Sequence, residues 1–179
     1  VVVGRFAQQG DLCLAAVGST GSLTSLIVNM FVGLSVGTNV VAARAWGSGD
    51  HKAMEDSVHT SMLVSVVSGV ILAVVGVIGA RVFLEWMNTP EEVIDLSSLY
   101  LRIYFAGMPA NMIYNFGSAI LRSVGDTRRP LIYLIIAGVL NVILNLFFVI
   151  VLHMDVEGVA LATIISQAVS AALVVICLM

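Results

Sequence analysis

The sequence predicts an all-α integral membrane protein with five membrane-spanning helices. Its 179 residues are 59% hydrophobic and 11% charged, whereas soluble domains are about 25% charged. A water-soluble fold of this length would not bury so much apolar surface. Five uncharged runs approach or exceed the roughly 20 residues that a helix needs to cross a bilayer core. Runs of this length favour helices over the roughly 10-residue strands of a membrane barrel.

The first two predicted spans cover residues 12–43 and 57–80. The connection between them, at 44–56, is rich in polar and charged residues. Within it, Gly49 followed by Asp50 indicates that one helix stops and the next begins.

The third predicted span covers residues 90–121. The letters TPEE at 89–92 predict a helix start with Thr89 as N-cap, Pro90 at the first helical position and a capping-box glutamate. A helix of this length is roughly 45 Å long, so its first turns are expected outside the membrane core. Pro109 is expected to kink it.

The fourth and fifth predicted spans cover residues 130–154 and 158–179. They follow the short connections at 122–129 and 155–157. Both ends of the 179-residue sequence fall in or next to apolar segments, which predicts that the chain is part of a longer polytopic protein.

The distribution of basic residues predicts the orientation of the helices. The second connection, at 81–95, has one arginine and four carboxylates, and the fourth has no Lys or Arg. By the positive-inside rule the first and third connections are cytoplasmic. Their basic residues are Arg44, Lys52, Arg122, Arg128 and Arg129.

Three successive predicted helices each carry a stripe of polar residues. Two stripe positions, Asn145 and Thr163, lie within about ten residues of the turn at 155–157, so they have similar depth on antiparallel helices. Asn141 lies one turn deeper. The three form either interhelical hydrogen bonds, which average only about 0.6 kcal/mol, or the wall of a polar cavity. Further possible cavity-lining residues are Asn111, Tyr114, Asn115 and Gln167.

Several function classes are excluded by what these spans and loops lack. No GxSxG, HExxH or P-loop motif occurs, and no nucleophile–base pair is evident, so the sequence does not predict an enzyme. The three histidines have no metal-ligand spacing, so no metal site or cofactor is expected. No Lys/Arg run of the kind that binds nucleic acid is present.

Four segments together resemble the multidrug and toxic compound extrusion (MATE) family of transporters. The most specific is LRSVGDTRRP at 121–130, which resembles a cytoplasmic loop of that family. ARAWGSGD at 43–50 resembles its preceding cytoplasmic loop, and GVALATIISQ at 158–167 its sixth helix. VGRF at 3–6, with LAAVG at 14–18, resembles the end of its first helix and the start of its second. The loop motif consists of Gly125, Asp126, Thr127 and Arg128.

The resemblance implies a twelve-helix, two-lobe transporter in which residues 1–179 supply helices two to six of the amino-terminal lobe. Such proteins are multi-pass and export cationic or amphipathic small molecules by alternating access, in exchange for H⁺ or Na⁺. The implied location is a cell membrane, as in the bacterial inner membrane. The implied partners are small-molecule substrates, membrane lipid and the remaining lobe of the same polypeptide. Two alternatives are a related flippase for lipid-linked or polysaccharide precursors and a non-transporting membrane subunit.

The resemblance also implies an ion- or substrate-binding site. Some members of the family use an Asp in the first helix, an Asn and an Asp four residues apart in the fifth, and a Thr in the sixth. Asn141 and Thr163 match the Asn and the Thr, and Asn145 stands where the second Asp is expected. The first-helix Asp would fall before Val1. Because an amide does not titrate near neutral pH, a proton switch is not expected at Asn145.

Overall fold

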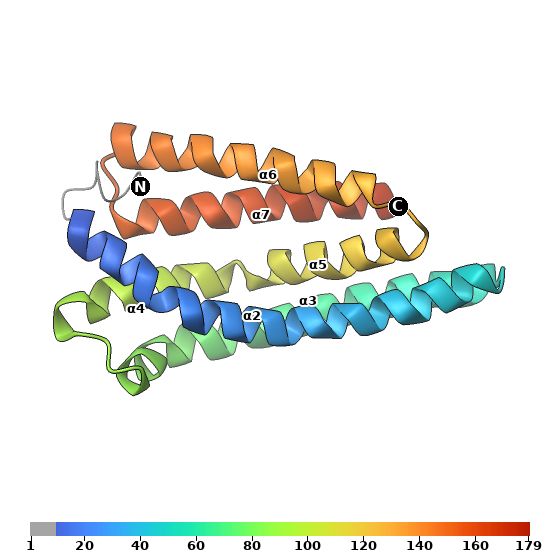
Figure 1. The fold of residues 1–179 in the computed structure, drawn as a ribbon, viewed down its shortest axis with the longest axis horizontal. Coiled ribbons are helices and arrows are strands. Elements are labelled where there is room, and N and C mark those ends of the chain that lie inside the picture. Colours follow the sequence, from blue (N-terminus) through green and yellow to red (C-terminus); the bar gives the residue numbers. More distant parts are fainter. Residues whose placement is uncertain (1–9) are drawn as a thin grey trace.

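The computed structural model describes residues 10–179, except for some side chains among residues 10–23, and they form an antiparallel bundle of helices (Figure 1). The segment VGRF at 3–6 lies outside the described residues. The all-helical prediction is confirmed for the described part, which contains six α-helices and one π-helical turn. Four helical segments are long and apolar enough to cross a membrane: Thr24–Gly47, His51–Trp86, Arg128–Val151 and Val156–Leu178.

The first hairpin consists of α2 (Gly10–Gly47) and α3 (His51–Trp86), and both helices are longer than the predicted spans. Hydropathy marks only the part of a helix that lies in lipid, whereas hydrogen bonding continues into the charged flanks. The turn itself is short, because Gly49 adopts φ +70° and Asp50 caps α3 by accepting a 2.9 Å hydrogen bond from the Ala53 backbone N–H.

The third predicted span is not one continuous helix. It is divided into α4 (Glu91–Ala106) and α5 (Met108–Ser123), each of 16 residues and each too short to cross a bilayer core alone. The expected distortion at Pro109 is confirmed, because a proline has no N–H to donate to the carbonyl four residues earlier. The capping box predicted at the start of this span was wrong, since Pro90 occupies the N-cap position and no side chain caps α4.

The last hairpin consists of α6 (Arg128–Leu146), the π-helical turn η1 (Phe147–Val151) and α7 (Val156–Leu178). In Figure 1 the turns before α3 and before α6 lie at one end of the bundle, and those before α4 and α7 lie at the other. Alternate connections therefore share a side, as the charge pattern requires; that the basic side is cytoplasmic stays a prediction.

The bundle is closely packed where α3 meets the break between α4 and α5. Phe105 and Met108, on either side of the break, are 1% and 0% exposed. A Cβ atom on Gly76 would lie 2.1 Å from the ring of Phe105, so only a glycine lets the two helices approach this closely. The core around them also includes Leu72, Ala80, Leu84, Leu101, Met112 and Phe116.

The α6 helix is little covered by the rest of the bundle, less than α3 or α7. Only Pro130 and Ala137 are buried on it, and large apolar side chains such as Ile135 and Val142 are each 56% exposed. A water-soluble protein would not present such a surface, whereas lipid tails cover it without cost. The helix packs mainly on α7, so these two helices form a pair beside the α2–α5 group.

Candidate functional site

The space between the α6–α7 pair and the rest of the bundle contains a cavity of about 680 Å³. All four of the helices α2, α5, α6 and α7 contribute to its wall. It is lined by Val28, Val32, Asn111, Tyr114, Asn115, Arg122, Leu134, Ala137, Gly138, Asn141, Thr163, Ser166, Gln167 and Ser170. Most of the polar lining groups are neutral amides and hydroxyls, which suits recognition of a ligand by hydrogen bonds.

The α5 wall carries three of the predicted lining residues. The Asn115 amide Nδ2 donates to the backbone O and to Oδ1 of Asn111, both at 2.8 Å. The Tyr114 hydroxyl donates to the carbonyl of Pro130 at 3.0 Å. This last bond links α5 to the first turn of α6.

The opposite wall brings Asn141 on α6 next to α7. Its Nδ2 lies 3.4 Å from Thr163 Oγ1 and 3.3 Å from Ser166 Oγ. Both hydroxyls in turn donate to α7 backbone carbonyls, at 2.9 Å each. The depth estimate from the sequence matched Asn145 with Thr163 and put Asn141 one turn deeper, whereas the structure brings Asn141 itself next to Thr163 and Ser166 across the α6–α7 interface.

Asn145 contacts this group but does not line the cavity. Its Nδ2 donates to the backbone O and to Oδ1 of Asn141, both at 2.9 Å, while its own Oδ1 is buried without a hydrogen-bond partner among the described residues. Gln167 lines the cavity, and its Oε1 likewise has no such partner. These two oxygens are acceptors that the described part of the fold leaves unused, which carries a free-energy cost unless something else binds them.

Hydrogen-bond geometry distinguishes asparagines that hold helices together from asparagines that line or support the cavity. The side-chain amides of Asn115 and Asn145 bond within their own helices, so they contribute nothing to holding helices together. The bonds from Asn141 to α7 exceed the usual 2.7–3.2 Å range. A contrasting case is Asn39 on α2, whose Nδ2 bonds the α5 carbonyl of Ala119 at 2.8 Å and which does not line the cavity.

Ser166 and Arg122 are among the lining residues that were not predicted from the sequence. Ser166 lies three positions after Thr163, so helical spacing would have indicated it. Arg122 was assigned only to the cytoplasmic connection, although it follows Asn115 by seven positions on the same helix and therefore lies on the same face. Helical periodicity was a usable signal in both cases.

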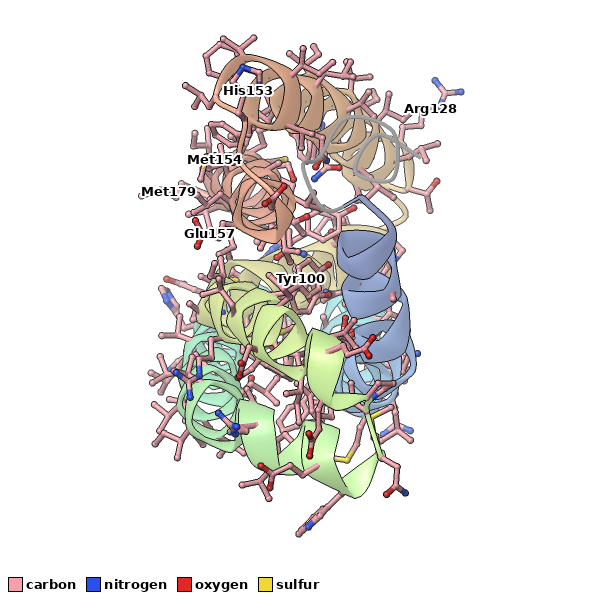
Figure 2. All side chains as sticks on the ribbon, turned by 90° about the vertical axis from the view of Figure 1, so that its left-hand side faces the viewer. Tyr100, Arg128, His153, Met154, Glu157 and Met179 are labelled. Atoms are coloured by element: carbon pink, nitrogen blue, oxygen red, sulfur yellow. The ribbon has the colours of Figure 1, made fainter. Side chains whose placement is uncertain are left out.

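The GDTR motif forms the turn between α5 and α6. Gly125 adopts φ +87°, a conformation that favours glycine. The Asp126 carboxylate accepts the Arg129 backbone N–H at 3.1 Å and lies 3.2 Å from Arg129 Nε, so it stabilises the start of α6. Arg128 is exposed and projects away from the helices (Figure 2). Thr127 precedes it without a capping side-chain bond.

An apolar cluster lies between the cavity and the end of the bundle that is opposite the GDTR turn. Val149 and Val156 are fully buried there, and Tyr100 of α4 packs against them (Figure 2). Among the side chains that the structure describes, no group of three or more His, Cys, Asp or Glu has a metal-binding arrangement.

Comparisons with known proteins identify the family of the chain. The MatE family model matches residues 1–147. The Probable multidrug resistance protein YoeA of Bacillus subtilis (strain 168) is 33% identical over 172 residues, which are 93% of this chain and 36% of that protein.

Solved structures of multidrug resistance MATE family transporters are similar in fold. An inward-facing one has a TM-score of 0.92 and 27% identity, covering 99% of this chain and 40% of that chain. An outward-facing one has a TM-score of 0.89 and 27% identity, covering 99% and 39%. The chain thus spans about two fifths of the length of its relatives. It belongs to the MatE family, a family of multi-pass membrane transporters and not of enzymes.

Proposed function

We propose that the chain forms the amino-terminal lobe, helices two to six, of a cation-coupled antiporter that exports amphipathic or cationic small molecules. The observation that carries this proposal is the cavity of about 680 Å³ with its neutral polar wall. In a membrane protein whose helices are only packed together, an interhelical amide is expected at the usual hydrogen-bond distance from its partners. The Asn141 amide instead lies 3.3–3.4 Å from its two partners, beside an open space. The partners in this proposal are the substrate, membrane lipid and a second lobe, in a bacterial inner membrane.

The similarity to two transporter conformations supports alternating access. The chain superposes on an inward-facing structure with a TM-score of 0.92 and on an outward-facing one with 0.89. A lobe that fits both states so closely changes little between them. Rocking of one lobe against another is then the motion that exposes the cavity to each side in turn.

The coupling ion is proposed to bind near Asn141, Asn145 and Thr163. Their side-chain oxygens are neutral hard ligands of the kind that Na⁺ accepts. The unpartnered Asn145 Oδ1 is an unused acceptor at this position. Because none of these side chains titrates near neutral pH, H⁺ coupling would require a carboxylate elsewhere in the transporter.

Two other functions are weighed against the same cavity. A flippase for phosphate-bearing lipid precursors would need basic residues along the cavity, whereas the described lining has Arg122 alone, at one end of α5. A non-transporting subunit would use its asparagines for packing, whereas Asn115 and Asn145 bond within their own helices.

The test is export by cells whose own efflux pumps are deleted. Asn141→Leu and Asn145→Leu in the full-length protein are expected to lower resistance to toxic amphiphiles at normal membrane levels. Asn39→Leu is the matched control: it removes an interhelical bond outside the cavity and is expected to leave resistance intact. Normal resistance in both the Asn141→Leu and the Asn145→Leu variants would refute the proposal, as would equal loss in the control.

A further inference from the structure

The cavity has one charged group in its described lining, the guanidinium of Arg122. This residue is in the last turn of α5, next to the GDTR turn. No carboxylate from the described residues lines the cavity. The formal charge of the described part of the wall is therefore positive, whereas the exported compounds expected from the family resemblance are cationic or amphipathic.

Arg122 also differs from two other arginines of the chain in having no ion pair among the described residues. Arg81 is 3.3 Å from Glu85 and 3.5 Å from Asp95. The carboxylate closest to Arg122 in the sequence, Asp126, is engaged by Arg129 at 3.2 Å. The side chain of Arg122 is exposed, so its planar guanidinium is available for a bidentate contact with a carboxylate or phosphate.

The spacing of residues along α5 sets the length of a ligand that could contact both the asparagine amides and the Arg122 guanidinium. Asn111, Asn115 and Arg122 lie on one face of the helix, at intervals of four and seven residues. At 1.5 Å per residue, Arg122 is roughly 10 Å from Asn115 along the helix axis. An amphiphile about this long would reach the amides with its neutral part and Arg122 with an acidic end.

We propose that Arg122 binds a carboxylate or phosphate of the substrate, so that among amphiphiles, cationic ones included, this lobe prefers those that carry an acidic group over analogues that lack it. This inference rests on the proposed function of the cavity and names the substrate class. The acidic end lies at the GDTR end of the cavity, and the neutral part of the substrate is held by the amides of Asn115 and Asn141.

The experiment compares two dyes that differ in one group. Tetramethylrhodamine has a free carboxylate, and its methyl ester has the same ring system without it. Binding of each to the purified full-length protein is measured by fluorescence anisotropy. Wild type is expected to bind the acid more tightly than the ester. Arg122→Gln is expected to weaken binding of the acid about tenfold and to leave the ester within about twofold. Arg122→Lys should retain part of the preference for the acid. Arg128→Gln removes an exposed arginine outside the cavity and should leave the binding of both dyes unchanged.

Each alternative outcome is decisive. Equal weakening of both dyes by Arg122→Gln would overturn the inference but leave the proposed function standing, because both dyes would still bind wild type. A wild-type preference for the ester would also overturn it. If wild type bound neither dye, the inference and the proposed function would fall together.

A lipid phosphate is the other source of the same chemistry. The measurement is therefore repeated in nanodiscs of phosphatidylcholine and in nanodiscs that also contain phosphatidylglycerol. A preference for the acid in both supports a substrate site. A preference that vanishes with phosphatidylglycerol would assign Arg122 to a lipid headgroup and overturn the substrate assignment.

Discussion

Gly69 on α3 provides the sharpest stability prediction, because it contacts the break between α4 and α5. A Cβ atom added there would lie 2.5 Å from Pro109 Cα, 3.1 Å from Pro109 N and 3.3 Å from Pro109 Cβ. The first two are backbone atoms, so rotation of a side chain cannot relieve the clash. Gly69→Ala therefore requires α3 to move away from α5 along one of the largest interfaces of the bundle.

The expected magnitude follows from two opposing terms. Overpacking costs up to about 3 kcal/mol, and the better helix propensity of alanine returns about 1 kcal/mol. The net loss of about 2 kcal/mol corresponds to a melting temperature lower by about 4–8 °C for a chain of this size.

The assay is thermal unfolding of the purified protein in one detergent, monitored by tryptophan fluorescence. Gly37→Ala is the matched control, since no atom lies within 4 Å of the added Cβ at that position of α2. The control is expected to unfold at or above the wild-type temperature. Equal shifts of the two variants would refute the close contact at Pro109.

Two further predictions concern a buried hydroxyl and the topology. Ser118 is 1% exposed and its Oγ has no hydrogen-bond partner among the described residues, so Ser118→Ala is expected to leave the melting temperature unchanged or raise it. Ser65→Ala should lower the melting temperature, because it removes a 2.7 Å bond to the Met62 carbonyl. A larger decrease for Ser118→Ala than for Ser65→Ala would contradict the assignment of the Ser118 hydroxyl as unpartnered. Arg128→Cys, in a background without native cysteines, should react with an impermeant maleimide only from the cytoplasmic side. Labelling from outside in intact cells would invert the predicted topology.

The spans were predictable because a bilayer imposes a length on apolar runs, but their ends were not. The apolar part of α3 stops well before the helix does, since lipid requires apolar side chains and the helical hydrogen bonds do not. The third span differed in another way, because the sequence predicted one helix where the structure has two. Its apolar run is continuous through Gly107, and only Pro109 indicated that two helices occupy it.

The position of the candidate site was largely predictable from helical periodicity and one turn. The short connection at 155–157 placed this group at one depth to within a helical turn; it matched Asn145 with Thr163, whereas the structure brings Asn141 to 3.4 Å from Thr163. Whether a residue faces the cavity or only supports its wall was not predictable. Asn145 shares the stripe of Asn141, yet its amide folds back on that residue. Arg122 has no ion pair among the described residues while Asp126 is engaged by Arg129, which spacing alone does not reveal.

The central claim is that the space between α5 and the α6–α7 pair holds the substrate. The most direct measurement is the dissociation constant of tetramethylrhodamine methyl ester for wild type, Asn141→Leu and Asn39→Leu, each as purified full-length protein. The prediction is that Asn141→Leu weakens binding about tenfold and Asn39→Leu leaves it within about twofold. Unchanged binding in Asn141→Leu, or the same loss in Asn39→Leu, would contradict the claim.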